Sequence, residues 1–172
     1  MAMQDLFIAK PLTISFQKEN LTMAGKYLSL MVHFVWSTAG REPRITAEWN
    51  NDLYKFIGGV FRNKNASLLA AGGISDHIHL YASLPSTVTV AEMVNAAKAN
   101  SSRWIHEEFR NRKGFAWQEG YGAFSVSKSA EDNVIGYINN QAKHHRHRDF
   151  KSEFIELLER HEVEYDEPYI WR

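Results

Sequence analysis

The segment at residues 75–84, Ser-Asp-His-Ile-His-Leu-Tyr-Ala-Ser-Leu, alternates from residue 77 onwards: the apolar side chains at 78, 80, 82 and 84 are separated by His, His, Tyr and Ser. A period of two predicts a β-strand, with Ile78 on the core face and both His77 and His79 on the opposite face. Two imidazoles that project the same way from one rigid strand can bind a single metal ion. A His-x-His pair is common by itself, so a metal site needs a second element. His33, on an earlier predicted strand and without a near partner in sequence, is expected to be a packed or surface residue.

The order of the other predicted elements indicates the fold class. Alternation and helical spacing predict strands over 27–37, 67–74 and 123–126 and helices over 46–62, 89–112, 129–148 and 150–161. The order β-α-β-β-α-β followed by helices is that of a ferredoxin-like, or split βαβ, α+β domain. We therefore expect an antiparallel sheet with helices on one face, followed by further C-terminal helices.

Local signals set the expected ends of several elements. Thr46 and Ser129 can each cap the start of a helix, and residues 89–92 match the pattern of a capping box. Gly72 and Gly73 are expected to form a bend or tight turn before the histidine strand.

Length and composition bound the class of protein. A chain of 172 residues with 44% hydrophobic residues is expected to form one domain, over residues 27–172. Residues 1–26 show no sustained period and are expected to be an extension outside the core. The absence of cysteine excludes disulfides, thiolate metal sites and cysteine nucleophiles, and it suits a cytoplasmic location. No apolar run is long enough for a membrane span, and no secretory signal is evident.

The formal net charge of zero conceals an uneven distribution. Residues 1–152 contain 18 Lys and Arg against 13 Asp and Glu, whereas residues 153–172 contain 2 against 7. An acidic tail therefore masks a body of charge +5, which suits a polyanionic partner. A solvated surface followed by an acidic helix explains the same distribution, so charge alone leaves both readings open.

Tyr137 and Gln141 form the second element. They lie four residues apart on a predicted helix and so share a face, with His144 and His145 following near that face. A tyrosine beside a metal site is a candidate nucleophile, because its phenol can attack phosphorus and hold the product covalently. Gln141 offers an amide oxygen as a third ligand, which would complete a site without an anionic ligand. Spacing alone favours the plainer reading of a partly exposed pair on a surface helix.

Several matching motifs, found in the expected order along the chain, support this prediction more strongly than the spacing of two residues does. The chain resembles the single-tyrosine HUH transposases of small bacterial insertion sequences (the TnpA type), including their repeat-associated relatives. The resemblance runs from about residue 27 to residue 171, and residues 1–26 have no counterpart. The matching segments are residues 76–80, 101–104, 117–126, 137–141 with His144 and His145, and 164–171.

The resemblance implies a function and a set of roles. The HUH pattern falls on residues 77–79, the family nucleophile on Tyr137 and the helix-borne metal ligand on Gln141. It implies a divalent metal, Mg²⁺ or Mn²⁺, and a substrate of single-stranded DNA folded into a hairpin. It also implies cleavage and rejoining through a 5′-phosphotyrosine, and a homodimer. The tyrosine helix then completes the histidine site of its own subunit or that of the partner, and the sequence leaves both arrangements open.

Nine side chains are candidate DNA contacts. Aromatic residues can stack on unpaired bases while Lys and Arg follow the backbone. Packing of the two aromatic residues against the sheet is an equal alternative for them. The candidates are Arg41, Arg44, Lys98, Arg103, Trp117, Tyr121, Lys143, Arg146 and Arg148.

Two other functions stay open on the sequence. One is a host-retained DNA-binding protein that recognises palindromic repeat hairpins without transposition. Intact His77, His79, Tyr137 and Gln141 argue against a loss of catalysis but not against domestication. The other is a His-x-His hydrolase of small phosphoesters, which leaves the tyrosine without a role.

Overall fold

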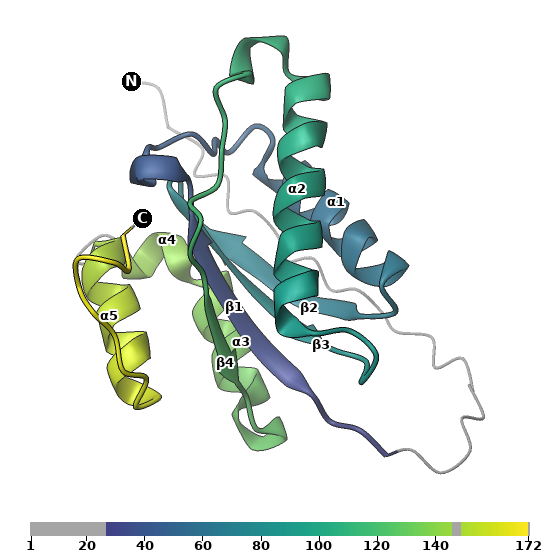
Figure 1. Cartoon of the computed structure of the whole chain (residues 1–172), viewed down its shortest axis with the longest axis vertical. Helices are drawn as coiled ribbons and strands as arrows, with labels where there is room; N and C mark the ends of the chain where they lie inside the picture. Colours follow the sequence, from purple (N-terminus) through teal and green to yellow (C-terminus); the bar gives the residue numbers. More distant parts are fainter. Residues whose placement is uncertain (1–26, 146–148, 172) are drawn as a thin grey trace, which may run out of the picture.

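A four-stranded antiparallel sheet forms the centre of the computed structural model, which describes residues 27–145 and 149–171 (Figure 1). The expected extension, residues 1–26, lies outside the described residues. The strands, in the order β2-β3-β1-β4, are β1 (Met31–Ser37), β2 (Ser67–Gly73), β3 (His77–Ser83) and β4 (Gly122–Ser125). Helix α1 (Asn50–Asn63) connects β1 to β2, and α2 (Val90–Glu108) connects β3 to β4. This order confirms the predicted ferredoxin-like α+β fold.

Helices α1 and α2 cover one face of the sheet (Figure 1). Phe34 and Trp36 of β1 and Ile78 and Leu80 of β3 are buried against them, because alternate side chains of a strand point to the same face. This layer is the main hydrophobic core, and it keeps the two central strands rigid.

The opposite face of the sheet is covered by the C-terminal helices α3 (Glu131–Asn139), α4 (Gln141–His144) and α5 (Phe150–Arg160) (Figure 1). This second face carries His33, His77 and His79, all of which are buried. Helix α5 is held there by Phe154 and other apolar side chains that pack on Val35. The histidine pair therefore lies in a closed layer between the sheet and the C-terminal helices. No helix in the described part of the chain has the length and apolar character that a bilayer span needs.

The capping box at residues 89–92 is confirmed, since Thr89 and Glu92 exchange the two expected hydrogen bonds. The other two predicted caps are wrong. The Thr46 hydroxyl is buried and has no hydrogen-bond partner among the described residues, and α1 begins only at Asn50. The Ser129 hydroxyl pairs with a neighbouring serine, and α3 begins after a short 3₁₀ turn. Helix α2 also ends at Glu108, ahead of the predicted residue 112, because a second 3₁₀ turn follows it.

The predicted single helix over residues 129–148 is divided at Asn140. The backbone of Asn140 leaves the helical region, at φ −105° and ψ 16°. Its side-chain amide donates to the Gly136 carbonyl at 2.7 Å, so the side chain satisfies a backbone group at the end of α3. Tyr137 therefore belongs to α3 and Gln141 to α4. The predicted end of this helix, at Arg148, lies outside the described residues.

Gly72 and Gly73 do not form the predicted turn. They are the last residues of β2, and Gly72 pairs with His79. A Cβ atom on Gly72 would lie 2.3 Å from the carbonyl oxygen of Ile138, which is too close for any real contact. The missing side chain thus lets the backbone of α3 approach the edge strand, and this approach positions the helix that carries Tyr137.

Replacing Gly72 with alanine should destabilise the fold by about 2–3 kcal/mol, because the obstructing atom belongs to the backbone and cannot rotate away. Urea denaturation measures the change. Gly136→Ala is the matched control: an added Cβ there meets no atom within 4 Å, and alanine should stabilise the helix by up to about 1 kcal/mol. Equal stability of the Gly72→Ala variant and the unmodified protein would show that α3 is not held by this close approach.

Candidate metal and nucleophile site

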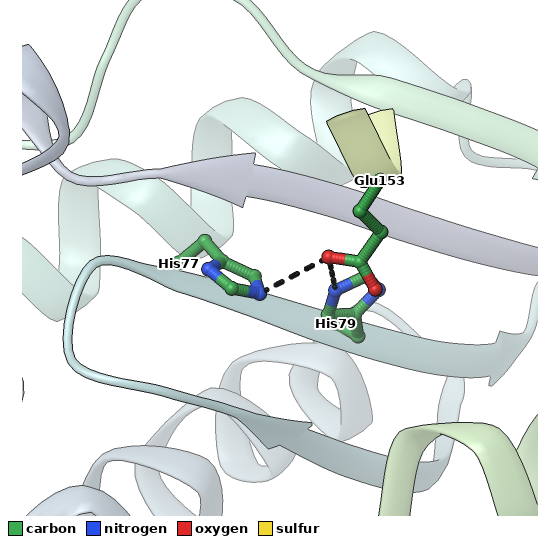
Figure 2. A group of neighbouring side chains, drawn as sticks. All are labelled: His77, His79 and Glu153. Atoms are coloured by element: carbon green, nitrogen blue, oxygen red, sulfur yellow. Dashed lines mark ion pairs between the residues drawn. The ribbon is translucent and has the colours of Figure 1, made fainter. Parts of the chain in front are cut away.

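Strand β3 places His77 and His79 side by side on the face opposite Ile78, as the alternation predicted. Both imidazoles are fully buried, and the Nε2 atom of each lies 3.4 Å from Oε2 of Glu153 on α5 (Figure 2). One ligand atom from each of the three residues lies within 4.8 Å of the others. Two imidazole nitrogens and one carboxylate oxygen form a donor set that divalent metals bind.

Outer hydrogen bonds fix both histidine rings. The Nδ1 atom of His77 hydrogen-bonds Oδ1 of Asp76 at 2.7 Å, and Nδ1 of His79 hydrogen-bonds Nε2 of His33 at 3.0 Å. The inward Nε2 atom of His79 is buried and, within the part of the chain described, has no hydrogen-bond partner. A buried nitrogen of this kind beside the Glu153 carboxylate fits a bound cation.

The ionisation states of these groups suit metal binding. Burial lowers the pKa of His79 to about 4 and that of His33 to about 3, because a charged imidazole would lose its hydration. Burial acts on Glu153 in the opposite direction and by itself would raise the pKa of its carboxyl group. Hydrogen bonds from His145 and Tyr137 and the proximity of His79 outweigh this effect and lower that pKa well below its ordinary value. At neutral pH the site therefore holds the Glu153 carboxylate beside a neutral His79, the form in which histidine binds metals.

Glu153 is the central residue of the site, and the sequence analysis missed it. Its carboxylate accepts hydrogen bonds from the Tyr137 hydroxyl, from Nε2 of Gln141 at 3.0 Å and from Nε2 of His145 at 2.9 Å. The sequence analysis expected neutral ligands only, whereas the structure places a carboxylate beside the histidine pair. A signal was available, because Glu153 interrupts the apolar stripe of α5 and a charged residue on a buried face needs partners.

Gln141, the predicted third ligand, lies beside the cluster. Its Oε1 atom is 3.3 Å from Nε2 of His77 and 3.1 Å from Nε2 of His145. Its amide nitrogen donates a hydrogen bond to Glu153. The structure thus brings two oxygen donors, one carboxylate and one amide, to the histidine pair.

Tyr137 lies at the same site and is half-buried. Its ring meets that of His79 edge-on, with 5.6 Å between centroids, and its hydroxyl donates to Oε1 of Glu153. The candidate nucleophile and the histidine pair therefore meet within one chain. Whether a partner's helix supplies the tyrosine within a homodimer stays a prediction.

Two of the predicted DNA contacts are built into the fold. The Lys98 ammonium donates to the backbone carbonyls of residues 118, 119 and 120 at 2.9, 3.1 and 2.7 Å, and burial lowers the pKa of Lys98 to about 8. Trp117 is 8% exposed and donates its indole N–H to Ser101 at 2.9 Å. Lys98 fastens the loop after Trp117 to α2, and Trp117 has the packing role that was the alternative to base stacking.

The other predicted DNA contacts lie nearer the surface. Tyr121 is 37% exposed, and Arg103 and Lys143 are also exposed. Arg41 lies over the ring of Trp171, and Arg44 forms an ion pair with a neighbouring glutamate at 2.5 Å. Arg146 and Arg148 lie outside the described residues. Contact of these side chains with DNA stays a prediction.

Residues 26–141 match the family model described as "Transposase IS200 like". Curated relatives include the transposases for insertion sequence element IS200 of Salmonella typhimurium and Salmonella typhi. Each is 28% identical over 116 residues, which is 63% of this chain and 74% of the relative. His77, His79, Tyr137 and Gln141 lie inside the stretch that the family model matches, whereas Glu153 lies beyond it.

Two solved structures share the fold. A candidate transposase from Deinococcus radiodurans is 24% identical with a TM-score of 0.57, and the match covers 68% of this chain and 94% of that one. A REP-associated tyrosine transposase, solved bound to a REP hairpin, is 16% identical with a TM-score of 0.53, over 76% of this chain and 74% of that one. At these identities the likeness establishes the fold.

Proposed function

This chain belongs to the IS200-like transposase family, and from that premise we propose that it cleaves and rejoins single-stranded DNA with Tyr137 as the nucleophile. The proposal rests chiefly on one observation: the Tyr137 hydroxyl donates to Glu153, which is also part of the buried group with His77 and His79. A nucleophile, an acceptor for its hydrogen and a candidate metal site thus lie together. A hydrolase of small phosphoesters would give the tyrosine no role.

His77, His79 and Glu153 would hold the divalent ion, with the Gln141 amide oxygen close enough to join them. When bound, Mg²⁺ or Mn²⁺ polarises a phosphoryl oxygen and offsets the charge that develops there. Mixed nitrogen and oxygen ligands suit Mn²⁺ at least as well as Mg²⁺.

The side chains support one transesterification. The Tyr137 oxygen forms a bond to the phosphorus while the bond from phosphorus to the 3′-oxygen breaks, which leaves a 5′-phosphotyrosine and a strand ending in a 3′-hydroxyl. The phenolic proton leaves along the hydrogen bond to Glu153 and passes on to solvent, and the departing 3′-oxygen takes up a proton from water. Because the phosphotyrosine is itself a phosphodiester, a second 3′-hydroxyl can attack it, rejoin the strands and regenerate Tyr137.

A single strand folded into a hairpin is the substrate that we propose. The solved protein of the same fold bound to a REP hairpin supports this choice. Tyr121, Arg103 and Lys143 are exposed and available for contact with the strand. A homodimer through the sheet is also proposed, because β2 and β4 are the edge strands of the sheet and edge strands that lack a strand partner on one side favour pairing.

Strand cleavage tests this function. The full chain is incubated with an oligonucleotide that carries a palindrome from the DNA flanking its gene, with Mn²⁺, with Mg²⁺ or with a chelator. We expect cleavage of the single-stranded hairpin only with metal, and none of the same sequence as a full duplex. Tight hairpin binding without cleavage under all conditions would instead favour the host-retained DNA-binding protein.

A further inference from the structure

His33 is a buried histidine that the proposed chemistry does not use. It lies on β1, is 4% exposed and pairs in register with Tyr81, while its neighbour Val35 pairs with His79. His33 and His79 are thus diagonal neighbours on the same face of adjacent strands. Their rings are nearly parallel, at 27° with 5.2 Å between centroids, and 3.0 Å separates Nε2 of His33 from Nδ1 of His79.

Only one hydrogen can lie between two ring nitrogens at this distance. A neutral imidazole carries one N–H and one lone pair, so the position of that hydrogen decides which nitrogen of His79 can bind a metal. With the hydrogen on Nδ1, His79 donates to His33 and keeps a lone pair on Nε2. With the hydrogen on Nε2, the lone pair of His79 faces His33 and no ion can bind at Nε2.

The surroundings of His79 select its Nε2 atom as the metal-facing one. That atom is buried, makes no hydrogen bond among the described residues and lies 3.4 Å from Glu153. His77 shows the same division, with Nδ1 held by Asp76 at 2.7 Å and Nε2 directed at Glu153. The Nδ1 atom of His77 is thus held by the Asp76 carboxylate, and that of His79 by the His33 imidazole.

We infer that His33 is a positioning residue for the metal site: its Nε2 atom accepts the hydrogen of His79 Nδ1 and so keeps His79 Nε2 free to bind the ion. The inference rests on the proposed function, since it concerns the same ion, but it assigns a role to a residue outside the ligand set. It predicts that metal affinity depends on a hydrogen-bond acceptor at position 33 rather than on the bulk of the side chain.

Three substitutions at position 33 separate these alternatives. In His33→Gln an amide oxygen can take the place of Nε2, whereas in His33→Asn the same amide is one methylene too short. His33→Phe fills the space without offering an acceptor. We expect Mn²⁺ affinity within about threefold of the unmodified protein for Gln, and about 10- to 100-fold weaker for Asn and Phe, the usual range for a lost outer partner of a metal ligand.

Titration of Mn²⁺ into the metal-free full chain, followed by electron paramagnetic resonance, measures these affinities, and thermal unfolding checks that each variant is folded. Tyr81→Phe is the control: it removes a hydroxyl on the same sheet face as His33 that donates a hydrogen bond to Glu131, and it should leave the Mn²⁺ affinity unchanged.

The role of His33 would be overturned if Mn²⁺ affinity depended on side-chain size, with the His33→Phe variant close to the unmodified protein and the His33→Gln variant weaker. The proposed function would still stand. A failure of the unmodified protein to bind Mn²⁺ would overturn the metal site and the inference together. Should the Phe variant not fold, the comparison of Gln with Asn still decides, and equal affinities of these two variants would refute the inference.

Discussion

Replacing His79 with alanine should weaken Mn²⁺ binding by more than about 100-fold, because it removes one of two nitrogen ligands and not merely an outer partner. The remaining candidate donors, His77, Glu153 and the Gln141 amide oxygen, would leave the ion with a single nitrogen ligand. Loss of affinity should bring loss of strand cleavage with it. Titration of Mn²⁺ monitored by paramagnetic resonance gives the affinity directly.

His106→Ala is the control for this change. His106 is a structural histidine whose Nε2 atom hydrogen-bonds the Phe115 carbonyl at 2.8 Å, away from the site. Its replacement should lower stability and leave Mn²⁺ affinity unchanged. If the His79→Ala variant binds Mn²⁺ as tightly as the unmodified protein, the ion is held elsewhere and the assignment of the histidine pair fails.

Replacing Tyr137 with phenylalanine should reduce cleavage of the hairpin by about 10⁴-fold or more, since it removes the attacking atom itself. The loss of its hydrogen bond should cost about 1 kcal/mol of stability, because Glu153 keeps its bonds from Gln141 and His145. Hairpin binding should stay within about threefold, because the hydroxyl is directed at Glu153 rather than at solvent. Single-turnover cleavage and a binding titration separate the two effects.

Tyr81→Phe is the matched control for the nucleophile. Tyr81 is a second tyrosine on the same sheet face, and its hydroxyl donates to Glu131 at 3.1 Å. The Tyr81 variant should cleave normally. Cleavage by the Tyr137→Phe variant at the unmodified rate would show that Tyr137 is not the nucleophile.

The strands were predictable because their signal is local. Alternation in residues 77–83 fixed which side chains face the core, and the structure has both histidines on the predicted face. The capping box at the start of α2 was readable for the same reason, since both partners lie within one turn. The break at Asn140 was not predictable, because helical spacing continues through it and the side-chain hydrogen bond that accompanies it is seen only in the structure.

The candidate site was only half predictable. The resemblance pointed to Tyr137 and Gln141, but Glu153 lies on a separate helix whose approach to the sheet depends on tertiary packing. In the sequence, only the position of Glu153 on the apolar face of α5 indicated that this residue is buried. His33 was expected to be packed or exposed because its partner, His79, is 46 residues away in sequence and adjacent only through the pairing of β1 with β3.

The central claim is that Tyr137 forms a covalent bond to DNA, and the mass of the denatured protein after reaction tests it most directly. The full chain is incubated with Mn²⁺ and a hairpin oligonucleotide, denatured, digested and analysed by mass spectrometry. The account predicts a peptide containing Tyr137 that carries the 5′-phosphate and the nucleotides downstream of the cut. Cleaved DNA without any adduct, or an adduct on another residue, would contradict it.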